Sequence, residues 1–265
     1  MGKTKKNSNY QTEKRLAAIA LAERKEKRAR LIKILLAIFI PVVVLITIIS
    51  IIVCSIGADN GWFRDPNAVT HYVTFIFDRY DGLIDDKGYP INAEVTMELY
   101  GEEAPETVAN FVKLCEDGYY NGVLFHRLID GFVAQGGDGD GTPDGLNYDN
   151  KPSITGEFSS NGYLNRIAHV KGTVSMARRG NDPNSASTQF FIVLETSANN
   201  TKKLDGNYAA FGKVIKGMDF FTFVAKGKNT DKESISEDEM PKILTVMVET
   251  PEEYEKRTAT VDTAD

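Results

Sequence analysis

The side chains that most often carry catalysis are sparse in this sequence. Its histidines, His71, His126 and His169, have no second histidine four residues away and no neighbouring cysteine, so their spacing argues against a zinc site. Four aspartates over 138–149 are spaced like part of a calcium loop. The sixth position of that loop is Pro143 where glycine is required, and the twelfth is an aspartate where glutamate is usual. The sequence therefore predicts neither a metal nor another cofactor.

The sequence also contains no clear motif for nucleotide binding or for hydrolysis. The glycine-rich segment GGDGDG at 136–141 lacks the Lys-Ser/Thr ending of a phosphate-binding loop and opens no predicted helix. Ser175 and Ser187 do not lie in a G-x-S-x-G motif and have no evident base nearby in the sequence. These sequence features argue against a hydrolase or a nucleotide-binding enzyme.

Two other stretches have an unusual mixture of residues. The segment FHRLIDGFVAQGGD (125–138) places one cation, Arg127, among aromatic and aliphatic residues, with Gln135 shortly after it. The segment SMARRGNDPNSASTQFFIVL (175–194) adds Gln189 beside a run of apolar residues. Taken one residue at a time, this composition favours buried core aromatics beside a surface charge over a functional site.

Taken together, the two segments resemble the cyclophilin signature F-H-R-x-I-x-G-F-x-x-Q-G-G-D followed by S-M-A-x…S-Q-F-F-I. A third segment, LDGNYAAFGKV (204–214), is similar to the family's L-D-G-x-x-x-x-F-G-x-V. The resemblance runs from about residue 70 to 249. Within it, the sequence is more similar to bacterial cyclophilins than to eukaryotic ones. It implies a closed eight-stranded antiparallel β-barrel capped by two α-helices, and peptidyl-prolyl cis-trans isomerase activity on proline-containing polypeptides.

The resemblance also implies roles for individual residues. Arg127 matches the catalytic arginine and Gln135 the amide that holds it. Arg178 stands where the family often has Asn, Tyr208 where it usually has His, and Lys203 where it frequently has Trp. Because that Trp is associated with cyclosporin binding, weak sensitivity to the drug is expected. The positions that match substrate-binding residues are His126, Phe132, Val133, Ala177, Arg178, Gln189, Phe191, Leu204 and Tyr208.

The elements that must position these residues are mostly short strands. Residues 71–80 and 93–100 alternate apolar and polar side chains and predict a hairpin with a long connection. Residues 105–117 predict a helix with Pro105 in its first turn and an apolar face. A second helix is expected over 217–225. Further strands are predicted over 123–128, 172–178, 189–194, 209–214 and 242–248, a pattern that favours a barrel over a βαβ sheet.

Charge divides the chain into two unlike parts. Residues 1–33 hold eleven Lys or Arg and three acidic residues, a net of +8, whereas the remainder holds 20 basic and 34 acidic residues, a net of -14. Between them, residues 34–56 carry no charge for 23 positions, enough to cross a bilayer as a helix. The positive-inside rule predicts a single-pass signal-anchor in the cell membrane, with the N-terminus cytoplasmic and the acidic part outside. Cleavage or lipidation near Cys54 stays an alternative.

The predicted organisation has five parts. They are a basic cytoplasmic segment at 1–33, a lipid-embedded helix at 34–56, a linker at 57–68, a monomeric isomerase domain at 69–250 and a polar, disordered tail at 251–265. The helix-favouring segment 11–33 is expected to be solvated or to contact anionic lipid, and nucleic-acid binding is not predicted. Cys115 is expected in the core.

Two other functions compete with an isomerase. One is a membrane-tethered module that binds proline peptides or acts as a scaffold with little catalysis, which Arg178 and Lys203 favour because they replace uncharged groove residues. The other is a chaperone whose acidic surface keeps unfolded clients in solution.

Overall fold

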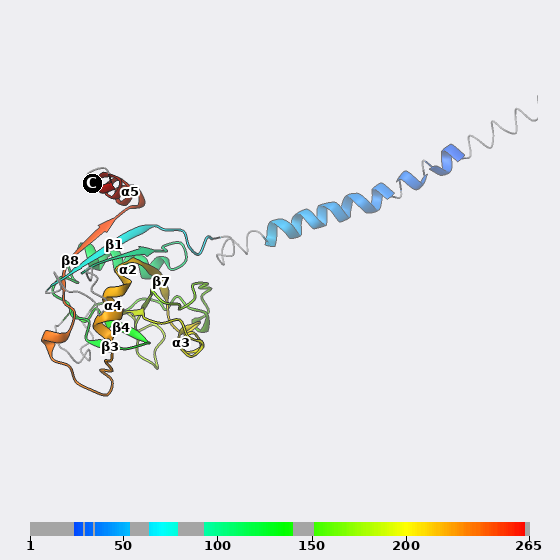
Figure 1. Cartoon of the computed structure of the whole chain (residues 1–265). Coiled ribbons are helices and arrows are strands. Elements are labelled where there is room, and N and C mark those ends of the chain that lie inside the picture. The colour runs from blue at the N-terminus through cyan, green and yellow to red at the C-terminus, as the bar shows by residue number, and fades with distance from the viewer. Residues whose placement is uncertain are drawn as a thin grey trace, which may run out of the picture. The chain divides into compact units, whose positions relative to one another are not determined.

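Eight short strands form one curled antiparallel sheet in the part of the chain that follows the apolar segment (Figure 1). The order of the strands across the sheet is β3-β4-β6-β5-β7-β2-β1-β8. Their bounds are β1 His71–Phe77, β2 Glu94–Leu99, β3 Arg127–Ile129, β4 Val133–Gly136, β5 Thr173–Met176, β6 Phe190–Val193, β7 Ala210–Lys216 and β8 Ile243–Glu249.

Helices join or flank these strands. They are α2 Pro105–Glu116, α3 Ala198–Leu204, α4 Met218–Ala225 and α5 Pro251–Asp262, with short 3₁₀ turns at Ser159–Asn161 and Glu237–Glu239. This computed structural model describes residues 24–28, 30–33, 35–53, 64–78, 93–139 and 151–262. The chain divides into two units, residues 1–62 and 63–265.

The first unit contains one long helix, Arg24–Val53. Its 30 residues correspond to about 45 Å at 1.5 Å per residue, and its length and apolar composition suffice to cross a membrane. Of the predicted span 34–56, residues 35–53 are helical, while 34 and 54–56 lie outside the described residues.

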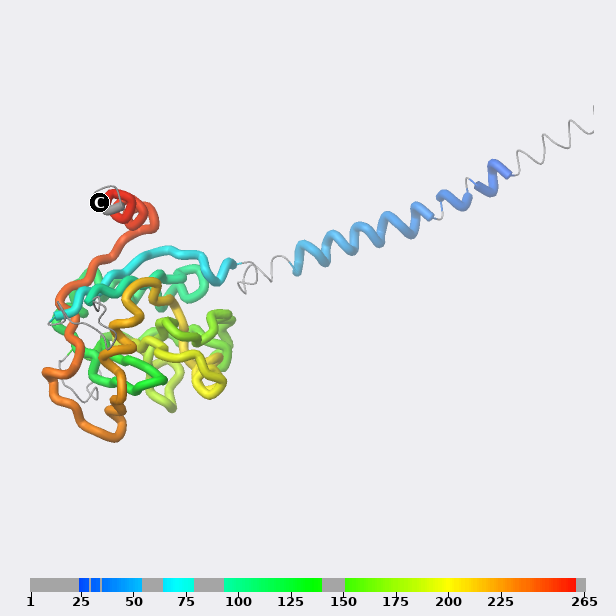
Figure 2. Tube along the Cα trace, viewed as in Figure 1, coloured from blue at the N-terminus to red at the C-terminus, as the bar shows by residue number. Residues whose placement is uncertain are grey.

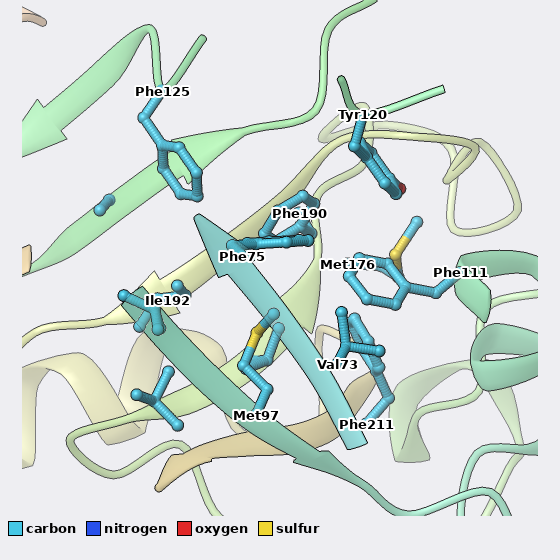
Figure 3. Packing of buried hydrophobic residues seen from close by; sticks show 14 of the residues in the cluster. Val73, Phe75, Met97, Phe111, Tyr120, Phe125, Met176, Phe190, Ile192 and Phe211 are labelled. Atoms are coloured by element: carbon cyan, nitrogen blue, oxygen red, sulfur yellow. The ribbon is translucent and has the colours of Figure 1, made fainter. Parts of the chain in front are cut away.

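Aromatic side chains fill the core between the sheet and two helices. In β1, Val73, Phe75 and Phe77 are almost fully buried on one face of the strand, while Thr74, also buried, and the exposed Ile76 lie on the other. The ring of Phe75 lies 5.8 Å from that of Phe190 in β6 and 6.3 Å from that of Phe111 in α2 (Figure 3). Helix α4 and Cys115 of α2 belong to the same cluster, so the prediction of a core cysteine is confirmed.

Helix α2 is capped by a residue from a distant loop. The carboxylate of Glu157 accepts hydrogen bonds from the backbone N–H groups of Glu106, at 3.1 Å, and Thr107, at 2.8 Å. The first N–H groups of a helix have no partner within it, and the positive end of the helix dipole favours an anion there. Burial nevertheless raises the pKa of Glu157, because desolvation outweighs these hydrogen bonds. The cap fixes the loop around residue 157 against the core.

The eight antiparallel strands agree with the expected fold class, but the closed barrel is not confirmed. Strands β3 and β8 lie at the two edges of the sheet, and no ladder joins them among the described residues. The segment just before β3 is joined to the start of β8 by an isolated bridge, Leu124–Lys242, and by hydrogen bonds such as Phe125 N–H to Pro241 O at 2.8 Å. These contacts are too irregular to continue the ladder, so the sheet stays open.

Strand β4 and helix α3 were absent from the sequence prediction. Strand β4 is only four residues long and contains a glycine, so it shows no clear alternation. Helix α3 has seven residues, and Ser197 caps it by accepting a hydrogen bond from Asn200 N–H. Both elements carry residues of the candidate site.

The predicted disordered tail is wrong for most of its length, because residues 251–262 form helix α5 (Figure 2). Glu253 and Thr250 form reciprocal capping contacts at the start of the helix. The ring of Tyr254 stacks on Tyr72 of β1 at 4.0 Å. Arg257 donates to both carboxylate oxygens of Glu249 at 2.7 and 2.8 Å. These contacts order a helix whose composition is polar.

Replacing Arg257 with Met should loosen α5. The substitution leaves Glu249, which is only 8% exposed, without its ion partner. Because Arg257 itself is partly exposed, solvent screens the pair, and we expect the docking of α5 to be destabilised by about 1–2 kcal/mol. We expect the α5 amides to exchange with deuterium roughly 5–30 times faster. Lys256→Met, which removes an exposed pair with Glu252, is the matched control. Equal exchange in both variants would contradict the role of the Arg257–Glu249 pair.

Candidate active site

Nine side chains line a cavity of about 220 Å³ on one side of the curled sheet. They come from β3, the turn after it, β4, β6, the residues after β5, the end of α3 and the loop before β7. All nine belong to the eleven site residues expected from the sequence. They are Arg127, Phe132, Val133, Gln135, Ala177, Arg178, Phe191, Leu204 and Tyr208.

Strand register brings the polar and apolar halves of this cavity together. Arg127 of β3 is paired with Gln135 of β4, and Gln135 is paired with Phe191 of β6. Directly paired residues of antiparallel strands project their side chains from the same face. The cation, the amide and the aromatic ring therefore form one row across three strands, although 64 positions separate the first from the last.

The apolar part of the cavity is a small cluster distinct from the main core. Val133, Phe191 and Leu204 are buried in it, and the rings of Phe132 and Tyr208 pack against it. The ring of Tyr208 meets Phe191 edge-on, with centroids 5.5 Å apart. The result is a preformed apolar pocket beside a charged residue.

Arg127 is fixed by three contacts at the edge of this pocket. Its Nε and Nη2 atoms donate to the two carboxylate oxygens of Asp231 at 2.7 and 2.8 Å, and Nη1 donates to Gln135 Oε1 at 3.3 Å. The guanidinium carbon lies 5.8 Å from the ring centroid of Phe132. The hydrogen bonds from Arg127 hold the pKa of Asp231 below its usual value. Charge-assisted paired bonds of this kind fix orientation as well as position.

Sequence analysis missed Asp231, which lies 104 residues from Arg127 in a loop without a motif. The loop runs beside β3, where Thr230 N–H donates to Leu128 O at 3.1 Å and Leu128 N–H donates to Thr230 Oγ1 at 3.0 Å. Asn229 forms a bridge with Ile129. This edge pairing delivers Asp231 to the guanidinium.

A line of amides behind the cavity fixes the orientation of Gln135. Asp138 Oδ2 accepts from Gln189 Nε2 at 3.1 Å, and Gln189 Oε1 accepts from Gln135 Nε2 at 3.0 Å. Because Gln189 donates through Nε2 to Asp138, its Oε1 accepts from Gln135 Nε2, and this turns Gln135 Oε1 toward Arg127. Gln189 thus acts through Gln135 and does not itself line the cavity.

Beneath Phe191 lies a second polar group that sequence reasoning did not find. His169 Nδ1 is 2.8 Å from Asp205 Oδ1, and its Nε2 is 3.0 Å from Ser175 Oγ. The expectation that Ser175 has no nearby base is therefore wrong. Burial lowers the pKa of His169, which favours the neutral ring. Ser175 is fully buried and does not line the cavity, so this group supports Phe191 from below and offers no accessible nucleophile.

His126 is the second expected substrate residue, after Gln189, that does not line the cavity. His126 precedes Arg127 in the chain, but its side chain is buried and does not line the cavity. Successive residues of an extended chain point to opposite sides, which accounts for the difference. No group of three or more His, Cys, Asp or Glu side chains is placed to hold a metal ion in the described parts of the chain.

Comparison with known proteins identifies the family. Residues 89–248 match the family described as "Cyclophilin type peptidyl-prolyl cis-trans isomerase/CLD", more than half of the chain. The chain belongs to the cyclophilin-type peptidyl-prolyl cis-trans isomerases. The match includes every residue that lines the cavity, together with Asp231.

Curated relatives and a solved structure agree with the cyclophilin assignment. Peptidyl-prolyl cis-trans isomerase B of Bacillus subtilis is 41% identical over 134 residues, which cover 51% of this chain and 85% of that protein. An Acinetobacter baylyi peptidyl-prolyl cis-trans isomerase is 39% identical over 132 residues, which cover 49% of this chain and 66% of that protein. A Cryptosporidium parvum cyclophilin crystallised in the presence of the dipeptide Ala-Pro is 25% identical, with a TM-score of 0.50, and covers 68% of this chain and 99% of that one.

The Arg127–Asp231 pair of this cyclophilin should respond to acid. Because the pKa of Asp231 is lowered in the folded state, the pair contributes stability above the ordinary carboxyl pKa of about 3.9 and loses it as pH falls through the lowered value. We expect the Arg127 Nε–H resonance to keep its folded-state chemical shift at pH 4 and to move only under stronger acid.

In Asp231→Asn, the same resonance should already be displaced at neutral pH. Glu233→Gln, in the same loop, is the control. An Arg127 resonance that is unaffected by Asp231→Asn would exclude the ion pair.

Proposed function

We propose that this cyclophilin accelerates rotation about X-Pro bonds in exported polypeptides, with Arg127 donating a hydrogen bond to the twisted prolyl amide. The observation that carries the proposal is a guanidinium held at the edge of an apolar pocket. The pocket suits a small apolar ring, and a related structure was obtained in the presence of a dipeptide that contains proline. The other side chains of the pocket serve to hold the proline.

The reaction explains why so few catalytic groups are needed. Resonance between the nitrogen lone pair and the carbonyl keeps the peptide planar, and rotation of an X-Pro bond has an activation energy of about 20 kcal/mol. No bond breaks and no proton has to move. A donor directed at the prolyl nitrogen localises the lone pair and weakens the resonance. The arginine can do this without an acid, a base, a nucleophile or a metal.

The contacts of Arg127 leave donors for the substrate. A guanidinium has five N–H groups, of which two bind Asp231 and one binds Gln135. Two N–H groups are left for the substrate amide. In our proposal Val133, Phe191 and Leu204 hold the ring while the preceding carbonyl rotates. Only stabilisation that is stronger in the twisted than in the planar state accelerates the reaction, and a fixed donor provides it without reorganisation.

Arg127→Ala should reduce catalysis while leaving the fold intact. The variant loses a charge-assisted hydrogen bond of about 1.5–3 kcal/mol in the twisted state, so kcat/KM should fall roughly 10–100-fold. The measurement is NMR exchange or a protease-coupled assay with a proline tetrapeptide. Lys113→Ala, which removes an exposed cation of α2, should keep the wild-type rate.

Unchanged turnover in Arg127→Ala would contradict the mechanism. The competing hypothesis of a peptide-binding or chaperone module predicts a different result. The wild-type chain would then bind the tetrapeptide without accelerating its isomerisation, and Arg127→Ala would alter affinity alone.

The proposal also places the isomerase domain outside the cell membrane, tethered by the N-terminal helix. Its support is the length and apolar composition of Arg24–Val53 together with the basic residues at its N-terminal end. Cations on that side favour retention of the N-terminus in the cytoplasm, while the acidic part of the chain follows the helix. Clients would then be polypeptides that fold after export.

Protease added to intact cells tests this topology. We expect the cyclophilin domain to be degraded without lysis, while an epitope tag at the N-terminus stays protected until detergent is added. A domain that resists protease until lysis would contradict export. Recovery of the domain in the medium without the tagged segment would show that the chain is cleaved after the apolar helix.

A further inference from the structure

A second arginine lines the cavity and is as firmly held as Arg127. Arg178 Nε donates to the backbone oxygen of Asn207 at 2.9 Å, and Nη1 donates to those of Arg179 and Gly180 at 2.9 and 3.2 Å. Its guanidinium carbon lies 4.9 Å from the ring centroid of Tyr208 and 5.1 Å from that of Phe158. Backbone oxygens and two aromatic rings thus fix the cation at the cavity wall.

The neighbours of Arg178 leave its charge unbalanced. Arg127, Arg166 and Arg257 each pair with a carboxylate. Among the residues that the structure describes, no carboxylate lies within 4.0 Å of Arg178, and its Nη2 atom makes no hydrogen bond. Nη2 therefore has two N–H groups for a ligand.

A second cation lies beside the same cavity. Lys203 Nζ is 5.6 Å from the ring centroid of Phe132, and no described carboxylate lies within 4.0 Å of it. The acids in this region are already engaged, because Asp231 binds Arg127 and Asp205 binds His169. The nine side chains that line the cavity therefore include two cations, Arg127 and Arg178, and no carboxylate, although the chain beyond residue 33 has a net charge of -14.

X-Pro rotation as proposed uses one donor and an apolar pocket, so it does not account for a second fixed guanidinium with unused N–H groups at the cavity wall. A planar guanidinium matches a carboxylate in shape and charge, and gives up little conformational freedom when its side chain is already held. We propose that Arg178, assisted by Lys203, binds an acidic side chain next to the proline, so that the enzyme prefers clients with Glu or Asp adjoining the isomerised bond. This inference rests on the proposed function and names its substrate class.

Blocked tetrapeptides provide the test, with the full chain in neutral detergent. One series is acetyl-Ala-Xaa-Pro-Phe-amide and the other is acetyl-Ala-Ala-Pro-Xaa-amide, with Glu, Gln or Lys at Xaa. In at least one series the Kd for the Glu peptide should be about 3-fold or more below that for Gln, and Lys should bind most weakly. The preference should shrink as salt rises from 0.05 to 0.5 M, a test range over which charges are increasingly screened.

Arg178→Gln should abolish the preference for Glu over Gln, and Arg178→Lys should retain part of it. Arg179→Gln removes the same charge from the adjacent position, which does not line the cavity, and should keep the wild-type ratio. Equal affinities for Glu and Gln peptides in both wild-type series would overturn the inference. So would a preference that persists in Arg178→Gln.

Exchange rates of the Gln peptides separate this inference from the proposed function. Acceleration of the Gln peptides without a preference for Glu would refute only the acidic specificity. Absence of acceleration for every peptide would refute the isomerase, while the order of the Kd values would still decide whether Arg178 recognises a carboxylate.

Discussion

The site depends on the antiparallel register of β3, β4 and β6. This register aligns Arg127, Gln135 and Phe191 in one row, so a shift by one residue would turn the guanidinium away from the aromatic ring. The surrounding contacts reinforce the same alignment. The line of amides ending at Asp138 fixes Gln135, and the loop that carries Asp231 pairs with the edge of β3. The geometry of the site and the pairing of these strands are thus one constraint.

The sequence predicted most of what lies within the family motifs. Arg127, Phe191 and Leu204 were identified because the resemblance preserves residue type and spacing, and the structure places them around one cavity. Long strands and α2 were equally accessible, since alternation and helical periodicity persist over six or more residues. Such signals are local, so the sequence of each segment by itself is enough to predict its strand or helix.

The rest depends on contacts between distant segments. Asp231 belongs to a loop without a motif, and the sequence contains no signal that it meets Arg127. His169 and Ser175 are only six positions apart, yet their hydrogen bond depends on the way the chain folds beneath Phe191. Helix α5 is polar, and ordering it requires Tyr72 and Glu249 from the sheet. Whether the sheet closes into a barrel likewise depends on how the edge strands β3 and β8 meet, which no local sequence pattern specifies.

The position of β1 has a mechanical consequence. This first strand of the domain lies between β2 and β8, with backbone pairing along both sides, and Tyr254 stacks on its Tyr72. A force applied through the segment before residue 64 would first strain the contacts of Arg64 with Tyr163 and Arg166. It would then load the two ladders of β1, whose hydrogen bonds on both sides share the load. An edge strand would instead peel away one bond at a time. The domain therefore receives any pull from its N-terminal side at a strand well suited to resist it.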